Sequence, residues 1–239
     1  MTRWVLFGAV VGVLTLAFVL LARRSAAVIR GAFEAREDPE APPHPAATLL
    51  ESDRLLLGNV LATHGLLLVV LGATVHVSSV PWEPLGLGVP SGAAVGLGLG
   101  LGLALAIGND AAARLADRLG LDRDERLREV LSPDTTAGWA VLLVVLLPLV
   151  AAAEEALFRA ALVGGLATGF GLDPWLLVLA SSVAFGLGHG LQGRAGVAVT
   201  TGLGAVLGAA FVLTGSLAAV AIAHYLVNAV EFLRHGRPG

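Results

Sequence analysis

The chain has 239 residues, of which 56% are hydrophobic and 14% are charged, which is too apolar for an ordinary soluble domain. It has no cysteine, which excludes a disulfide framework, a thiolate nucleophile and a thiolate metal site. The formal net charge of −3 points to no particular partner. We therefore expect an all-α, polytopic integral membrane protein surrounded by a lipid bilayer, with no nucleic-acid partner.

Apolar runs long enough to cross a hydrocarbon core about 30 Å thick recur along the whole chain. The first run could be mistaken for a secretory signal, but it is too long for one, and Arg23 and Arg24 follow it where a small-residue cleavage site would be expected. We interpret it as a retained helix. The sequence predicts about seven membrane helices, at residues 4–22, 55–79, 91–108, 138–167, 175–190, 195–213 and 216–233.

Two connections are long and charged. Residues 34–49 are proline-rich and predict a mobile loop. The stretch from Asn109 to Leu131 pairs opposite charges at helical spacing, Asp122 with Arg126 and Asp124 with Arg128, which predicts an interfacial helix on the membrane surface.

Arginine placement predicts the orientation, because cytoplasmic loops carry the excess of positive residues. Five arginines lie in residues 23–54 and five in residues 109–137, one is Arg194, and two follow the last helix. The intervening connections, at residues 80–90, 168–174 and 214–215, have none. This alternation predicts a plasma-membrane protein whose amino terminus is outside and whose carboxyl terminus is cytoplasmic.

Small residues recur every four positions in two of the predicted helices. They form ridges against which a neighbouring helix can pack closely. In the third helix the ridge is Gly92, Gly96, Gly100, Ala104 and Gly108, and in the sixth it is Gly204 and Gly208.

Three charges stand inside the apolar fourth helix, in the segment "VAAAEEALFRAALVGG". A charge at the bilayer centre costs about 2.5–3.5 kcal/mol, so each needs a partner or a purpose. Glu155 and Arg159 are four residues apart, as in an intrahelical ion pair. Glu154 points about 100° away from that pair and is not explained by it.

Two more pairs have the same spacing in later helices: Phe185 with His189, and His224 with Asn228. Three helices can thus aim a carboxylate, two imidazoles and a carboxamide at one point inside the bundle. This set suits peptide hydrolysis. A carboxylate can take a proton from water that an imidazole also holds, and N–H donors can stabilise the oxyanion of the tetrahedral intermediate.

The segments "EEALFR", "FGLGH" and "HYLVN" resemble the ordered motifs EExxxR, FxxxH and HxxxN of the CPBP family of intramembrane glutamic proteases. That family includes the CAAX prenyl endopeptidases and the bacteriocin-processing or immunity proteins. The resemblance implies that Glu154 is the general base on water, His189 its partner, and His224 with Asn228 the oxyanion hole. It also implies supporting roles, ion pairing for Glu155 and Arg159 and packing for Phe185.

The resemblance further implies a hydrolase that cleaves a membrane-associated peptide or protein and needs no cofactor or metal. Because it covers residues 138–233, we divide the chain into amino-terminal membrane helices with their loop and interfacial helix, residues 1–137, and a catalytic membrane core, residues 138–239.

Depth in the membrane raises a difficulty for this site. If the fourth helix entered the core at Gly138, Glu154 would lie about 24 Å deep and could not meet His189. A kink or a helix end at Pro148 would bring the two level, with residues 138–147 lying obliquely in the inner leaflet.

Other interpretations stay open. Two histidines and a glutamate can bind zinc, although the helical HExxH pattern is absent. Intramembrane carboxylates and histidines also relay protons in transporters, although the chain shows no internal repeat. A non-proteolytic scaffold or immunity protein on the same fold is a third alternative. His64, His76 and Asn59, in the second helix, are expected to bond a neighbouring helix or face an interface.

Overall fold

The computed structural model describes residues 2–38, 40, 42, 44–46, 52–120 and 126–235. These residues form helices and no β-strand, which confirms the predicted all-α class. Six helices are long and apolar enough to cross a membrane, and Pro174–Gly188 is a shorter apolar helix. The predicted seven helices are therefore all found.

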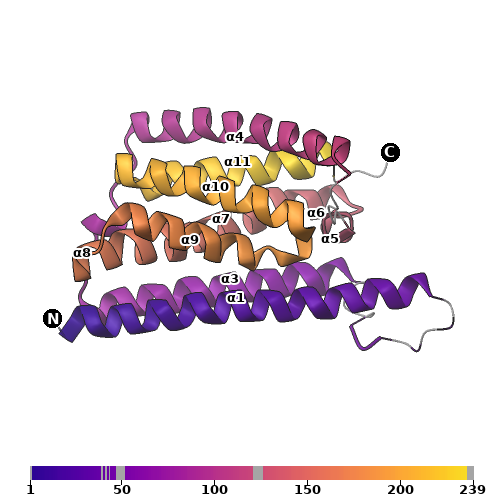
Figure 1. Cartoon of the computed structure of the whole chain (residues 1–239), viewed down its shortest axis with the longest axis horizontal. Coiled ribbons are helices and arrows are strands. Elements are labelled where there is room, and N and C mark those ends of the chain that lie inside the picture. The colour runs from indigo at the N-terminus through magenta and orange to yellow at the C-terminus, as the bar shows by residue number, and fades with distance from the viewer. Residues whose placement is uncertain are drawn as a thin grey trace.

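The helices run back and forth along one axis, and the two termini lie at opposite ends of the bundle (Figure 1). The amino-terminal helices are α1 (Thr2–Glu37), α3 (Asp53–Ser78), the 3-10 turn η1 (Glu83–Leu85), α4 (Gly92–Arg118) and α5 (Arg126–Leu131). A continuous stretch follows, made of α6 (Thr136–Val141), the π-helical η2 (Leu142–Leu146), α7 (Leu147–Glu155), the π-helical η3 (Ala156–Gly165) and α8 (Leu166–Phe170). The chain ends with α9 (Pro174–Gly188), the 3-10 turn η4 (Gly190–Gln192), α10 (Gly193–Thr214) and α11 (Leu217–His235).

The stretch from α6 to α8 lies at the centre of the bundle. Its α7 segment packs against α3 and α11, and its η3 segment packs against α1, α9 and α10. Some of the largest fully buried side chains of the described residues, Leu157, Phe158 and Arg159, belong to it. The charged segment of the sequence is therefore held where neighbouring helices, rather than lipid, surround it.

Pro148 does not end a helix, so that alternative of the sequence analysis is wrong. The helix is continuous from Thr136 to Phe170. Just before the proline, the N–H of Leu147 bonds the carbonyl of Leu142, five residues earlier. A π-helical turn of this kind shifts the backbone pairing and so accommodates a residue that has no N–H.

Helix α1 continues to Glu37 instead of ending near residue 22. Residues 23–37 contain alanine, arginine and glutamate and no proline, so nothing stops the helix where it leaves the apolar run. The added turns are used in packing, because Ala32 and Phe33 are buried with Val130 of α5. Glu37 also pairs with Arg126 at 3.2 Å.

The stretch predicted as one interfacial helix is divided in the structure. Its first part, to Arg118, is the end of α4, and its last part is the short α5. Asp122 and Asp124 lie outside the described residues. Arg128 pairs with Glu231 of α11 at 2.8 Å, so α5 is attached to the bundle.

The small-residue ridge of α4 is not the one predicted. Gly92, Gly96, Gly100 and Gly108 face open space, whereas the buried positions are Gly98, Gly102 and Ala106. A Cβ at Gly98 would lie 2.7 Å from the carbonyl oxygen of Ala219 in α11. The predicted contact at Gly204 and Gly208 of α10 is confirmed, because both lie against α9.

This difference gives a test of the α4–α11 contact. We expect Gly98→Ala to lower the free energy of unfolding by about 1–3 kcal/mol, because the added methyl meets backbone that cannot move aside. Gly100→Ala is the matched control. It lies in open space and should leave stability unchanged or raise it by up to about 1 kcal/mol through helix propensity. Thermal unfolding in detergent measures both, and equal stability of the two variants would contradict the contact.

Candidate active site

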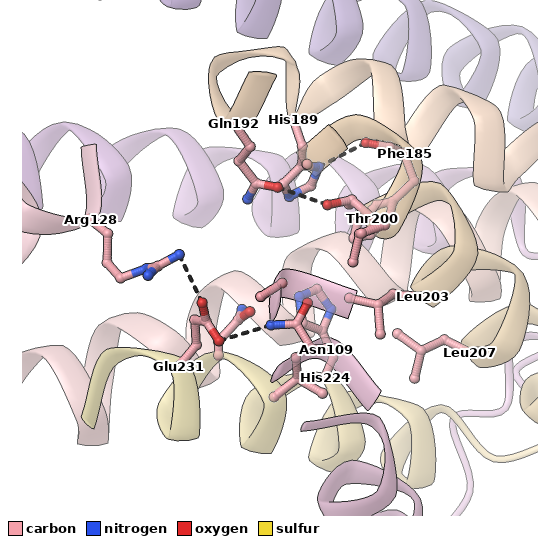
Figure 2. A pocket seen from close by; sticks show the side chains of 15 residues that line it. Asn109, Arg128, Phe185, His189, Gln192, Thr200, Leu203, Leu207, His224 and Glu231 are labelled. Carbon is pink, nitrogen blue, oxygen red and sulfur yellow. Dashed lines mark hydrogen bonds and ion pairs between the residues drawn. The ribbon is translucent and has the colours of Figure 1, made fainter. Parts of the chain in front are cut away.

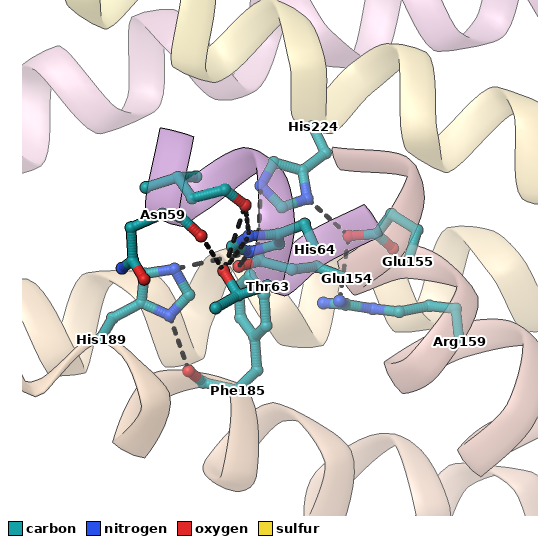
Figure 3. A network of polar contacts seen from close by, with 10 residues as sticks. Asn59, Thr63, His64, Glu154, Glu155, Arg159, Phe185, His189 and His224 are labelled. Atoms are coloured by element: carbon teal, nitrogen blue, oxygen red, sulfur yellow. Dashed lines mark hydrogen bonds and ion pairs between the residues drawn. The ribbon is translucent and has the colours of Figure 1, made fainter. Parts of the chain in front are cut away.

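The charged segment meets Phe185, His189 and His224 in one network of contacts, to which α3 also contributes (Figure 3). Glu154 and Glu155 come from the end of α7, and Arg159 from η3. His189 follows α9, and His224 lies in α11. Glu154 is 4% exposed, and Glu155 and Arg159 are fully buried.

Glu155 is the structural centre of this network. Its Oε1 accepts hydrogen bonds from Nη1 of Arg159 at 3.0 Å and from Nδ1 of His224 at 2.7 Å. Arg159 also donates from Nη2 to the carbonyl of Gly204 at 3.0 Å, which attaches α10. The buried charges are therefore paired, as their burial requires.

Phe185 packs against the guanidinium of Arg159 and against the rings of both histidines. Its side chain is 2% exposed, and the guanidinium of Arg159 lies 4.6 Å from the centre of its ring. The rings of His189 and His224 lie 4.6 and 5.7 Å from it, centre to centre. Phe185 thus occupies a packing position that fixes three polar groups at once.

Hydrogen bonds define which ring nitrogen of each histidine faces Glu154. Nδ1 of His224 contacts a carboxylate, and Nδ1 of His189 lies 2.8 Å from the carbonyl of Phe185. Both partners only accept, so both Nδ1 atoms carry a proton. The Nε2 atoms are then directed at Glu154, at 3.6 Å for His224 and 3.9 Å for His189, in each case from Oε2.

Oε2 of Glu154 is buried and has no hydrogen-bond partner among the described residues. Its distances to the two Nε2 atoms exceed a direct hydrogen bond, and they suit groups that share one bridging water. A carboxylate oxygen and two imidazole nitrogens therefore surround one point, where a small polar molecule can be held.

A cavity of about 120 Å³ lies beside this point (Figure 2). His189 and His224 line it and also contact Glu154, so they connect the carboxylate with the cavity. Asn228, one turn after His224, lines the same cavity and is half-buried. The structure thus brings the Nε2 atoms of His189 and His224 within 4 Å of Oε2 of Glu154 and places Asn228 on the adjoining wall.

One end of the cavity is polar. Glu231 accepts a hydrogen bond from Asn109 at 2.8 Å and forms the ion pair with Arg128 (Figure 2). Gln192 accepts a hydrogen bond from Thr200, also at 2.8 Å. Leu203 and Leu207 line the cavity away from these polar groups. The cavity therefore offers both polar and apolar surface to a ligand.

His64 of α3 also contacts Glu154; a contact with a neighbouring helix was expected for it, but a place beside the predicted site was not. Its Nε2 lies 3.5 Å from Oε1 of Glu154. A histidine in the middle of a membrane helix is a functional candidate by default, and that signal was present. The spacing of His64 within α3 could not reveal which helix it contacts. His76, on the same helix, lines a separate cavity of about 390 Å³ whose walls are mainly apolar.

Among the described residues, no group of three or more His, Cys, Asp or Glu side chains is arranged to hold a metal ion. The groups that surround the point beside Glu154 are its carboxylate and two imidazoles, with the amide of Asn228 on the adjoining cavity wall.

Residues 136–230 match the family model described as type II CAAX prenyl endopeptidase Rce1-like. This matched stretch contains all three motifs, and the resemblance stated from them is confirmed. It begins at α6 and leaves α1, α3 and α4 outside. Searches of the curated proteins and of the solved structures find no match to this chain.

Proposed function

We propose that this integral membrane protein, whose residues 136–230 match the Rce1-like family model of type II CAAX prenyl endopeptidases, is a glutamate-dependent intramembrane endopeptidase. The observation that carries the proposal is the buried Glu154. Its Oε2 faces the Nε2 atoms of His189 and His224 at the wall of a cavity.

In the proposed reaction, Glu154 and His189 hold a water molecule and aim its oxygen at a peptide carbonyl. Glu154 takes one proton as the water oxygen bonds the carbonyl carbon, and it later gives that proton to the leaving nitrogen when the C–N bond breaks. The products are a carboxylic acid and an amine. The carboxylate must be close to the water and shielded from bulk solvent, and the burial of Glu154 supports this requirement.

The oxyanion that forms in this step needs N–H donors. Asn228 offers its amide N–H from the cavity wall. For Nε2 of His224 to donate, both ring nitrogens must carry a proton, and the Glu155 carboxylate accepts the one on Nδ1. In a site of low dielectric, one such donor contributes about 2.7–4 kcal/mol to transition-state stabilisation.

We propose that a membrane-associated peptide reaches the site from the cytoplasmic side of the plasma membrane. The cavity includes Asn109 and Arg128, which lie near the carboxyl-terminal end of α4 and in α5. These elements belong to an arginine-rich connection, which the distribution of positive charge assigns to the cytoplasm. The amino terminus would then be outside and the carboxyl terminus inside.

A proteomic comparison tests the proposal. Cells that express the wild-type chain should contain membrane proteins with shortened carboxyl termini or internal cleavage products, and cells that express Glu154→Gln should not. Glu83→Gln, at an exposed position in η1, is the matched control and should resemble wild type. Identical termini in wild-type and Glu154→Gln cells would contradict the function.

Removal of metal ions gives a second test. We expect the purified protein to keep its full rate after exhaustive treatment with EDTA and 1,10-phenanthroline, because the proposed base and donors are protein groups. The substrate is a fluorogenic peptide with a farnesylated cysteine in a carboxyl-terminal CAAX sequence. A loss of activity that zinc restores would favour the zinc alternative over the glutamate mechanism.

A further inference from the structure

Helix α3 contacts the proposed catalytic carboxylate from outside the matched stretch. Nε2 of His64 lies 3.5 Å from Oε1 of Glu154, and the two side chains are 16% and 5% exposed. The contact is one part of the packing of α3 against α7. It joins the amino-terminal helices directly to the site.

The ring of His64 is held in one orientation. Its Nδ1 lies 2.9 Å from the carbonyl of Val60, one turn earlier in α3. A carbonyl only accepts hydrogen bonds, so Nδ1 carries the proton and Nε2 is directed at Glu154. His189 is held in the same way, by the carbonyl of Phe185 (Figure 3).

The three histidines do not all contact the same oxygen of Glu154. His64 faces Oε1, whereas His189 and His224 face Oε2. Rotation of the carboxylate about its last bond would exchange the two oxygens and turn the carboxylate plane away from the cavity wall. A partner on Oε1 alone opposes that rotation.

We propose that His64 is a positioning residue of the active site: it holds Oε1 of Glu154, so that Oε2 stays directed at the water shared with His189 and His224. This inference rests on the proposed function. His64 acts through Glu154 and touches neither the water nor the peptide.

The protonation state required of Glu154 also determines that of His64. A neutral His64 with its proton on Nδ1 presents a lone pair on Nε2, and an ionised carboxylate presents lone pairs too. The two therefore attract only when a proton lies between them. Glu154 must be ionised to act as a base, so the proton belongs to His64, and the imidazolium forms an ion pair with Oε1 across the 3.5 Å contact.

Kinetics of three variants tests the positioning role with the farnesylated CAAX-type peptide. We expect His64→Leu to lower kcat by roughly 10- to 100-fold, as a misplaced reacting group does, with KM changed by less than about twofold. His64→Gln, whose amide N–H can still donate to Oε1, should restore kcat to within about threefold of wild type. His76→Leu is the control on the same helix, away from Glu154, and should behave as wild type. Unchanged kcat in His64→Leu, or no rescue by His64→Gln, would overturn the proposal.

Infrared difference spectroscopy tests the contact without any substrate. The carboxyl and carboxylate bands of Glu154 are identified as those lost in Glu154→Gln. They should shift in His64→Leu and stay in place in His76→Leu. Bands that do not move in His64→Leu would refute the contact. If the wild-type protein cleaves nothing while these bands shift as expected, the proposed function fails and the His64–Glu154 contact stands.

Discussion

We expect Glu154→Gln to abolish cleavage of the farnesylated CAAX-type peptide, with a loss in kcat of about 10²–10⁴-fold or more, while the protein stays folded. The amide has the shape of the carboxylate but cannot take a proton from water. Structural damage should be small, because Glu154 forms no ion pair with Arg159, which is bound to Glu155 and Gly204 instead. The rate is measured with purified protein in detergent, and folding by thermal unfolding of the same samples.

The exposed Glu83→Gln change controls for loss of a glutamate charge and should leave the rate unchanged. A Glu154→Gln protein that keeps more than about a tenth of the wild-type kcat would show that another group is the base. The proposed mechanism would then be wrong, even if the protein proved to be a protease.

Arg159→Met is expected to destabilise the protein by about 3–5 kcal/mol, the usual effect of removing one partner of a buried ion pair. Arg159 is fully buried and bonds both Glu155 and the carbonyl of Gly204. Methionine fills much of the space but leaves both acceptors without this donor. The midpoint of thermal unfolding in detergent, compared with wild type, measures the loss.

The double variant Glu155→Leu, Arg159→Met tests whether Glu155 and Arg159 stabilise the protein as an ion pair or independently of each other. Residues in one network couple, so the double variant should lose less stability than the sum of the two single variants. Strict additivity would mean that the 3.0 Å contact contributes nothing to folding. His224 also loses its Glu155 partner in this variant, so activity is not expected to return with stability.

In the second helix, the sequence did not show which histidine contacts Glu154. His64 and His76 lie on the same helix and had the same interpretation from spacing and hydrophobicity. In the structure, His64 reaches Glu154, and His76 lines a separate cavity. The two residues are also about 18 Å apart along the helix axis. Which of them meets Glu154 depends on how α3 is placed and rotated against α7, and local sequence does not encode the identity of the neighbouring helix.

The glycines of α4 illustrate the same limit. The repeat of small residues every four positions is present on two faces, one with Gly96 and Gly100 and the other with Gly98 and Gly102. Both faces satisfy the pattern that permits close packing. In the structure the second face packs against α11, because a Cβ at Gly98 or at Gly102 would meet atoms of α11.

The sequence by itself determined the helical membrane class, the seven apolar segments and the polar pairs at four-residue spacing, because length, hydrophobicity and helical period are local properties of a chain. Tertiary structure decided how these pieces meet. It added His64 to the surroundings of Glu154, buried the end of α1 against α5 and selected the glycine face of α4 that packs against α11. The physical reason is that helix rotation and helix pairing depend on contacts between segments far apart in the chain, and these contacts have no local signature.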